Sequence, residues 1–175
     1  SMLANDIMTK KVITVSPTTS VKDLAKSLIV RFHKKDMDTF GQFMAKAEKV
    51  SSDPLQQLLL LVGFLEEMFD ALPEPYPGCL FASYIYQSQQ FDPETLAVCD
   101  LALKDFRRMF GEKLHQAMEK YQPKIKVDRD ELADLLTCTL EGAVILSRTL
   151  KDPKLVAPQL AHYRNYLQLL FLDEK

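Results

Sequence analysis

The stretch SSDPLQQLLLLVGFLEEMFDA, residues 51–71, decides which kind of fold this chain can form. Asp53 followed by Pro54 is a strong signal for the start of a helix, because aspartate caps free amide groups and proline suits the first helical position. Beyond this start, apolar side chains fall on nearly every side of a helix that runs to about Ala71. Because a helix that is apolar all round must be buried all round, we expect it at the centre of a helical bundle.

The segments on either side of this stretch also carry helical patterns. Asp92-Pro93 repeats the start signal, and Asp128 with Glu131 three residues later is close to a capping box. Asp36 is interpreted as the cap of a helix separate from one that begins at Val21. The helices expected outside the central one cover residues 21–29, 36–47, 80–85, 93–121, 129–150 and 153–171.

The composition agrees with an all-α fold. The chain has 175 residues, which suits one domain with a short appendage, and it contains only 5 glycines. So little glycine among so many helix formers argues against a turn-rich β fold. The formal net charge is −2, so there is no general attraction to nucleic acid or to an anionic membrane.

Cysteine usage and hydropathy indicate the compartment. Cys79, Cys99 and Cys138 are odd in number and far apart, and they form neither a C-x-x-C pair nor a disulfide framework. Buried thiols in a reducing cytoplasm are the simplest interpretation. The longest apolar run, around residues 58–65, is too short to span a bilayer, so no membrane association is expected.

The helix expected over residues 129–150 has two apolar faces. One face can pack on the chain's own core, and the second needs a partner, for which the same helices of a second copy are the simplest choice. Gly142 fits a close helix crossing, since glycine inside a helix costs about 1 kcal/mol relative to alanine; the alternative is that it relieves crowding within one subunit. The residues expected at this homodimer interface are Leu135, Gly142, Ile145, Leu146, Thr149, Leu160, Tyr163 and Leu167.

Signals for catalysis and for metal binding are weak. His33, His115 and His162 are isolated, and no H-x-x-x-H or H-E-x-x-H motif is present. The sequence also contains neither a glycine-rich phosphate loop nor a G-x-S-x-G motif. We therefore expect a protein that is not an enzyme and that holds neither a metal nor a cofactor.

Four stretches in a particular order are similar to a known family. They are Phe32–Asp36, Pro77–Leu80, Asp92-Pro93, and Leu140–Arg148 followed by Lys151-Asp152-Pro153. Together they resemble the C-terminal regulatory domain of the tetracycline-repressor (TetR) family over about four fifths of the chain. The resemblance implies an all-α helical bundle, a homodimer formed by the last two helices, and an apolar pocket for a small effector in each subunit. In such a regulator the effector changes the separation of two DNA-binding heads, which is a coupling between distinct sites.

The pocket implied by the resemblance would lie among the middle helices. Aromatic and methionine side chains suit an adaptable apolar site, although they could equally form an ordinary core. Tyr84 is the best candidate for a polar contact, because a buried phenol needs a hydrogen-bond partner. The residues expected to line the pocket are Phe64, Met68, Phe81, Tyr84, Ile85, Phe106, Met109 and Phe110.

The first thirty residues depart from the family pattern. Residues 12–15 are β-prone, and with residues 5–9 they resemble the opening of a cystathionine-β-synthase (CBS) domain, which binds adenosine nucleotides. A rival interpretation makes residues 18–25 the second helix of a damaged helix-turn-helix. In either case we expect an appendage over residues 1–30 without an intact DNA reader, followed by an effector-binding and dimerisation domain over residues 31–175.

Three functions are therefore open. The first is the effector-sensing, homodimerising domain of a TetR-family transcription regulator, with DNA contacted only through a helix-turn-helix head that is absent or incomplete here. The second is a nucleotide-sensing module of the CBS type acting through residues 3–30. The third is a helical scaffold that binds no ligand.

Overall fold

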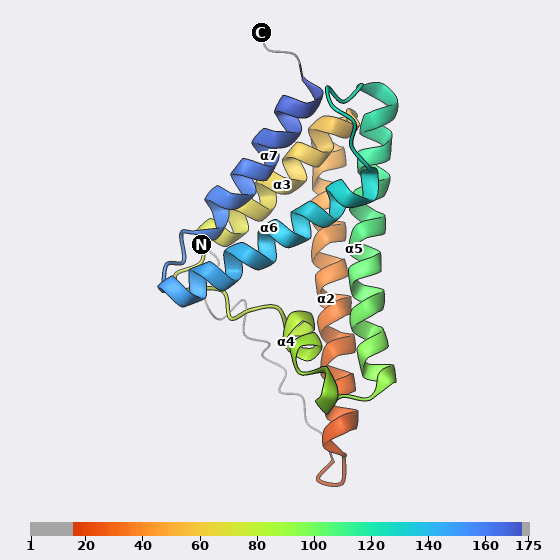
Figure 1. Ribbon diagram of the computed structural model, residues 1–175, viewed down its shortest axis with the longest axis vertical. Helices are drawn as coiled ribbons and strands as arrows, with labels where there is room; N and C mark the ends of the chain where they lie inside the picture. The colour runs from red at the N-terminus through yellow and green to blue at the C-terminus, as the bar shows by residue number, and fades with distance from the viewer. Residues whose placement is uncertain (1–15, 173–175) are drawn as a thin grey trace.

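The computed structural model describes residues 16–172, and this part of the chain folds into a bundle of helices (Figure 1). The expectation of an all-α fold is confirmed. The β-prone run at residues 12–15 and most of the CBS-like stretch lie outside the described residues. The elements are α2 (Val21–Val50), α3 (Pro54–Asp70), α4 (Leu80–Tyr86), a short 3-10 helix η1 (Ser88–Gln90), α5 (Pro93–Lys120), α6 (Arg129–Leu150) and α7 (Val156–Phe171).

The aspartate start signals are confirmed. Asp53 accepts a hydrogen bond from the amide of Gln56 at 2.9 Å, and Asp92 accepts one from the amide of Thr95 at 2.9 Å. The carboxylate of Asp128 receives two amides in the first turn of α6. Each bond satisfies a donor that the helix itself leaves free, so the local sequence decides where α3, α5 and α6 begin.

Helix α3 occupies the centre of the bundle, but Gln56, Glu67 and Asp70 keep one narrow side of it exposed, so it is not buried all round as expected. It packs against α7, α2 and α5, and α6 closes the bundle by packing against α5 and α7 (Figure 1). Leu55, Leu58, Leu61 and Val62 are fully buried. Burying each such side chain contributes about 1.5–3 kcal/mol before conformational entropy is subtracted, so α3 holds the surrounding helices together.

The expected break before Asp36 is wrong. Helix α2 runs without interruption from Val21 to Val50, with Ser20 as its N-cap, so Asp36 lies in mid-helix. The family-like junction at Phe32–Asp36 and the expected domain boundary at residues 30 and 31 both fall inside this helix. No proline interrupts the segment, so every backbone amide can continue to bond within the helix. The helix packs along its length against α4, α5 and α3.

The last helix begins later than expected. Asp152-Pro153 does not start it, because Lys151 adopts a left-handed conformation (φ 54°) that ends α6 and redirects the chain. The Asp152 amide donates to the Ser147 carbonyl at 3.0 Å, and the Ser147 hydroxyl donates to the Asp152 carbonyl at 2.6 Å. These bonds make residues 151–155 a turn, and α7 starts at Val156.

Polar side chains join α3 to α5 at one end of the bundle. Asp53 accepts hydrogen bonds from the Lys120 ammonium and from the Tyr121 hydroxyl, the latter at 2.6 Å. Partial burial alone would raise the pKa of Asp53, but these bonds and the Gln56 amide outweigh it and hold the pKa at about 2. One carboxylate thus caps α3 and ties it to the end of α5. No helix among residues 16–172 combines the length and hydropathy needed to cross a membrane.

Replacing Asp53 by alanine is expected to lower the free energy of unfolding by about 2 kcal/mol, because the cap and two charge-assisted bonds are lost together. Because the pKa of Asp53 is lowered in the folded state, its contribution is present above about pH 4 and is lost as the pH falls toward 2. Urea unfolding at several pH values measures both effects. Asp92→Ala is the matched control, since it removes a cap from the same Asp-Pro start, and an equal loss in the two variants would contradict the tether.

Candidate functional site

The side chains expected to line one apolar pocket divide between two packed clusters. Phe110 belongs to the main core around α3, α5, α6 and α7, and Met68 packs against that core. Phe81 and Tyr84 belong to a smaller cluster around α4 with Cys99, Ala102 and Ile29. Phe106 is the side chain of the set that touches both clusters. These residues therefore fill the protein rather than surround a common space.

Three of the expected lining residues lie elsewhere. Phe64 faces α2, where its ring packs against Phe43 and lies under the Lys46 ammonium, 3.9 Å from the ring centroid. Ile85 is 46% exposed on the outer side of α4. Met109 is half-buried on α5. Phe64 and Ile85 therefore lie apart from the other predicted lining residues, because helical spacing does not reveal which neighbour each face meets.

The Tyr84 hydroxyl already has a partner within the protein. It donates a hydrogen bond to the Ala25 carbonyl of α2 at 2.9 Å, and the ring stacks on Phe91 with centroids 4.1 Å apart. Burial raises the pKa of this phenol, so it stays a donor at physiological pH. Tyr84 thus joins α4 to the first half of α2, which is a structural role in place of the expected ligand contact.

A partly buried polar group lies between α2, α6 and the connector from α3 to α4. It consists of Asp36 on α2, Glu141 on α6, and Tyr76 and Cys79 on the connector, which we call the polar group. The Cys79 thiol lies beside the Glu141 carboxyl, and the charge of Glu141 contributes a small effect at Asp36. Four groups that can donate or accept hydrogen bonds therefore meet where three elements converge.

The ionisation of the polar group is shifted toward the neutral forms. Burial raises the pKa of Asp36 to about 6, and the nearby Glu141 adds to this, while Lys35 and His33 oppose it. Burial also raises the pKa of Glu141, the neighbouring Cys79 thiol offsetting part of the effect. The pKa values of Tyr76 and Cys79 are each raised to about 12, chiefly by burial. Perturbed groups of this kind are concentrated at functional sites, although buried structural networks share the property.

Sequence reasoning missed the polar group as a site. Asp36, Cys79 and Glu141 all stand in the family-like stretches, yet more than sixty residues separate Asp36 from Glu141 within an apolar pattern. The signal in the sequence that points to the polar group is an acidic residue inside an apolar stretch, such as Glu141 between Leu140 and Ala143. That signal does not say which other residues it meets.

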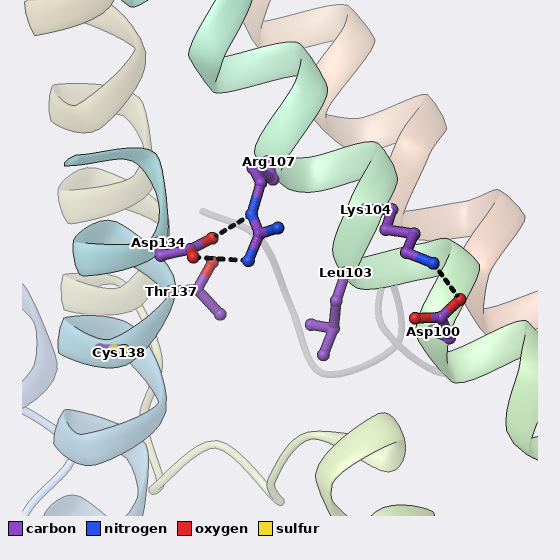
Figure 2. Close-up of a pocket in the computed structure, with 7 residues that line it drawn as sticks. All are labelled: Asp100, Leu103, Lys104, Arg107, Asp134, Thr137 and Cys138. Atoms are coloured by element: carbon purple, nitrogen blue, oxygen red, sulfur yellow. Dashed lines mark hydrogen bonds and ion pairs between the residues drawn. The ribbon is translucent and has the colours of Figure 1, made fainter. Parts of the chain in front are cut away.

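A shallow groove of about 330 Å³ lies between α5 and α6 (Figure 2). At one side of the groove Arg107 donates two hydrogen bonds, of 2.8 and 2.7 Å, to the Asp134 carboxylate. Lys104 forms an ion pair with Asp100 at 2.7 Å. Since these charges already neutralise one another, the groove shows no preference for an ionic ligand. Its lining residues are Asp100, Leu103, Lys104, Arg107, Asp134, Thr137 and Cys138.

The outer face of α6 carries exposed apolar side chains. Leu135, Ile145 and Leu146 are 41%, 52% and 50% exposed. Gly142 and Thr149 are exposed on the same face, at the three- and four-residue spacing of a helix. The structure therefore places five of the expected interface residues together on one surface, which we call the α6 face.

The other three expected interface residues are buried inside the chain. Leu160 and Leu167 on α7 are fully buried, and Tyr163 donates its hydroxyl to the Leu132 carbonyl at 2.9 Å. Within the chain, α7 turns these three side chains toward α3 and α6, so they do not lie on the α6 face. Leu169 is the large apolar side chain that α7 leaves exposed.

Replacing Asp36 by asparagine is expected to stabilise the protein at high pH only. Because the folded-state pKa is raised to about 6, the stability that Asp36 contributes is fully present below about pH 4 and is lost as the pH rises through 6. Asparagine avoids the charge, so D36N should gain about 1 kcal/mol at pH 8 and nothing at pH 4, allowing for solvent screening. Urea unfolding measures this, with Asp38→Asn on the exposed side of α2 as control; equal gains at the two pH values would contradict the burial of Asp36.

A solved structure shares this arrangement of helices. The regulatory protein TetR from Rhodobacter sphaeroides aligns with a TM-score of 0.60 and 19% identity, over 85% of this chain and 75% of that one. No family model matches the chain, and no curated protein is similar to it in sequence. At this identity the likeness concerns the fold, so the chain has a TetR-like all-α fold.

Proposed function

We propose that the chain is the effector-sensing and dimerisation domain of a TetR-type transcription regulator. The observation that carries the proposal is the uncovered apolar stripe on α6 in a chain with the fold of a TetR protein. Apolar stripes of this kind on single chains usually mark contacts with a partner. The simplest partner is a second copy, which would cover the stripe about a two-fold axis.

The environment of Gly142 supports a close helix crossing. An added Cβ at Gly142 would meet nothing within 4 Å in its own chain, so the glycine does not relieve crowding inside the subunit. Its cost in helix stability, about 1 kcal/mol, is instead offset if a second backbone approaches there. Leu135, Ile145 and Leu146 then supply the apolar contacts on both sides of the crossing.

The polar group supports a small-molecule effector between α2, α6 and the connector. Several large apolar side chains pack against the core near these elements and remain partly exposed, including Phe40, Met68 and Leu140. A mainly apolar ligand with one hydrogen-bonding group suits a lining of this composition. We infer that Asp36 and Glu141 provide that polar contact.

Helix α2 would transmit occupancy of this site. Its middle carries Asp36, and its first half is joined to the rest of the protein by Tyr84 through the Ala25 carbonyl. His33 Nε2 lies 3.0 Å from Asp105 Oδ2, a further contact of α2 with α5. A ligand that displaces α2 at Asp36 would therefore shift the start of the helix as a rigid rod.

Replacing Ile145 by glutamate should convert a dimer into a monomer, because a charge at the centre of an apolar interface loses its hydration. Size-exclusion chromatography with light scattering measures the mass in solution. Leu101→Glu is the matched control, since Leu101 is similarly exposed but lies on α5 away from the α6 face. A wild-type protein that is monomeric at micromolar concentration would refute the proposed dimer.

The effector site can be tested with 1-aminoanthracene, a small neutral fluorophore. We expect saturable binding to the wild-type protein and a loss of roughly tenfold or more in affinity in Met68→Trp, because the larger side chain fills space next to the core. Met118→Trp makes the same change near the end of α5 and should keep the wild-type affinity. Fluorescence titration measures both, and equal affinities in the two variants would place the ligand elsewhere.

A further inference from the structure

The connector between α3 and α4, residues 71–79, has the construction of a stiff arm. Pro73, Pro75 and Pro77 fix three of its backbone φ angles and provide no amide hydrogen to bond elsewhere. The arm leaves the corner where α3, α6 and α7 meet and crosses to α4 beside α6 (Figure 1). An arm of this kind can move as a unit, and what keeps it in place must come from neighbouring side chains.

Two cations hold this arm, Arg148 in the last turn of α6 and Lys154 in the turn that follows it. The Arg148 guanidinium donates a hydrogen bond to the Pro77 carbonyl, and the Lys154 ammonium donates to the Asp70 carbonyl at the last residue of α3. Lys154 Nζ also lies 3.4 Å from an oxygen of the Asp70 carboxylate. Lys154 therefore anchors the start of the arm, and Arg148 holds its far part against α6.

Gly78 provides the bend next to the Arg148 contact. Its φ is +115°, a conformation that residues with a side chain rarely adopt. A Cβ at this position would lie 3.3 Å from Arg148 Nη1, so the glycine also leaves room for the guanidinium. The point of bending and the point of attachment are thus adjacent, which is the arrangement of a hinge beside a latch.

The inner side of the arm covers the polar group. The Tyr76 ring packs edge-on against Phe69, with centroids 5.5 Å apart, and burial, followed by the nearby charges of Asp36 and Glu141, raises the pKa of its hydroxyl. Cys79 is half-buried beside Glu141 at the other end. Raising the arm would expose Tyr76 and Cys79 together, open a path to the carboxyls, and remove Leu72 and Tyr76 from the edge of the main core.

We propose that residues 71–79 form a strap that Arg148 latches over the polar group, and that breaking this latch lets the strap open about Gly78. The strap controls access from the side of the connector while the bundle stays folded. Its role as the gate for an effector rests on the proposed function. The opening itself requires neither an effector nor a dimer.

One alkylation experiment on the three cysteines distinguishes a local opening of the strap from a loosening of the whole bundle. Cys79 is the last residue of the strap and is half-buried, Cys99 is fully buried in the cluster around α4, and Cys138 is exposed on α6. Iodoacetamide reacts with the thiolate, so burial and the raised pKa keep Cys79 slow while the strap is closed. Peptide mass spectrometry of the alkylated full chain gives a rate for each thiol separately.

In Arg148→Ala, the alkylation rate of Cys79 should rise by roughly fivefold, as expected for the loss of one charge-assisted hydrogen bond at an exposed site, while Cys99 keeps its wild-type rate. Gly78→Ala should raise the rate of Cys79 in the same way, since its Cβ strains the closed bend. Arg31→Ala removes an exposed arginine from α2 and should leave all three rates unchanged.

Two results would overturn the strap. If Cys79 reacts at the wild-type rate in both Arg148→Ala and Gly78→Ala, the latch does not hold the connector. If Cys79 and Cys99 accelerate together, the variants loosen the whole bundle and no local opening exists. Because no effector is added, either result leaves the fluorophore titration as an independent test of the proposed function.

Discussion

Burial of α3 along all but one narrow side, where Gln56, Glu67 and Asp70 are exposed, governs how the other helices pack. A helix with fully buried leucines at positions 55, 58 and 61 must be surrounded, and α2, α5 and α7 supply the surrounding surfaces. Each of these helices presents one apolar side to α3, so its opposite side is free for another task. Asp53 joins the cap of α3 to the end of α5, which links the centre of the bundle to its border.

Helix α6 has sides that meet different surroundings, because only one of them packs on the core. Its inner side, with Leu136 and Ala143, packs on the core, and its outer side keeps an apolar stripe that its own chain does not cover. Glu141 lies on the flank between these two sides, facing the connector and α2. One helix therefore has a side packed on the core, an uncovered apolar side and a flank with a polar contact, because three of its directions in the bundle differ in what they meet.

Local signals and tertiary contacts differ in what they reveal here. Asp-Pro pairs and the Asp128 cap placed the starts of three helices correctly, since capping is a property of a few neighbouring residues. The same signal gave a wrong prediction at Asp36. An aspartate can either cap a helix or lie within one, and its neighbours in space determine which of the two occurs. Apolar character alone did not indicate which helix a side chain faces, because Phe64 and Phe110 are equally apolar and yet face different helices.

The all-α class, most helix starts and a second apolar face on α6 follow from the amino-acid sequence, because periodicity and capping are encoded within a few turns. That Leu160, Tyr163 and Leu167 face inward follows from the packing of the helices. The same packing decides that Asp36 meets Glu141 under a connector held by Arg148. Such meetings depend on how helices cross, and the crossing is set by the shape of the whole packed core, which no single segment carries.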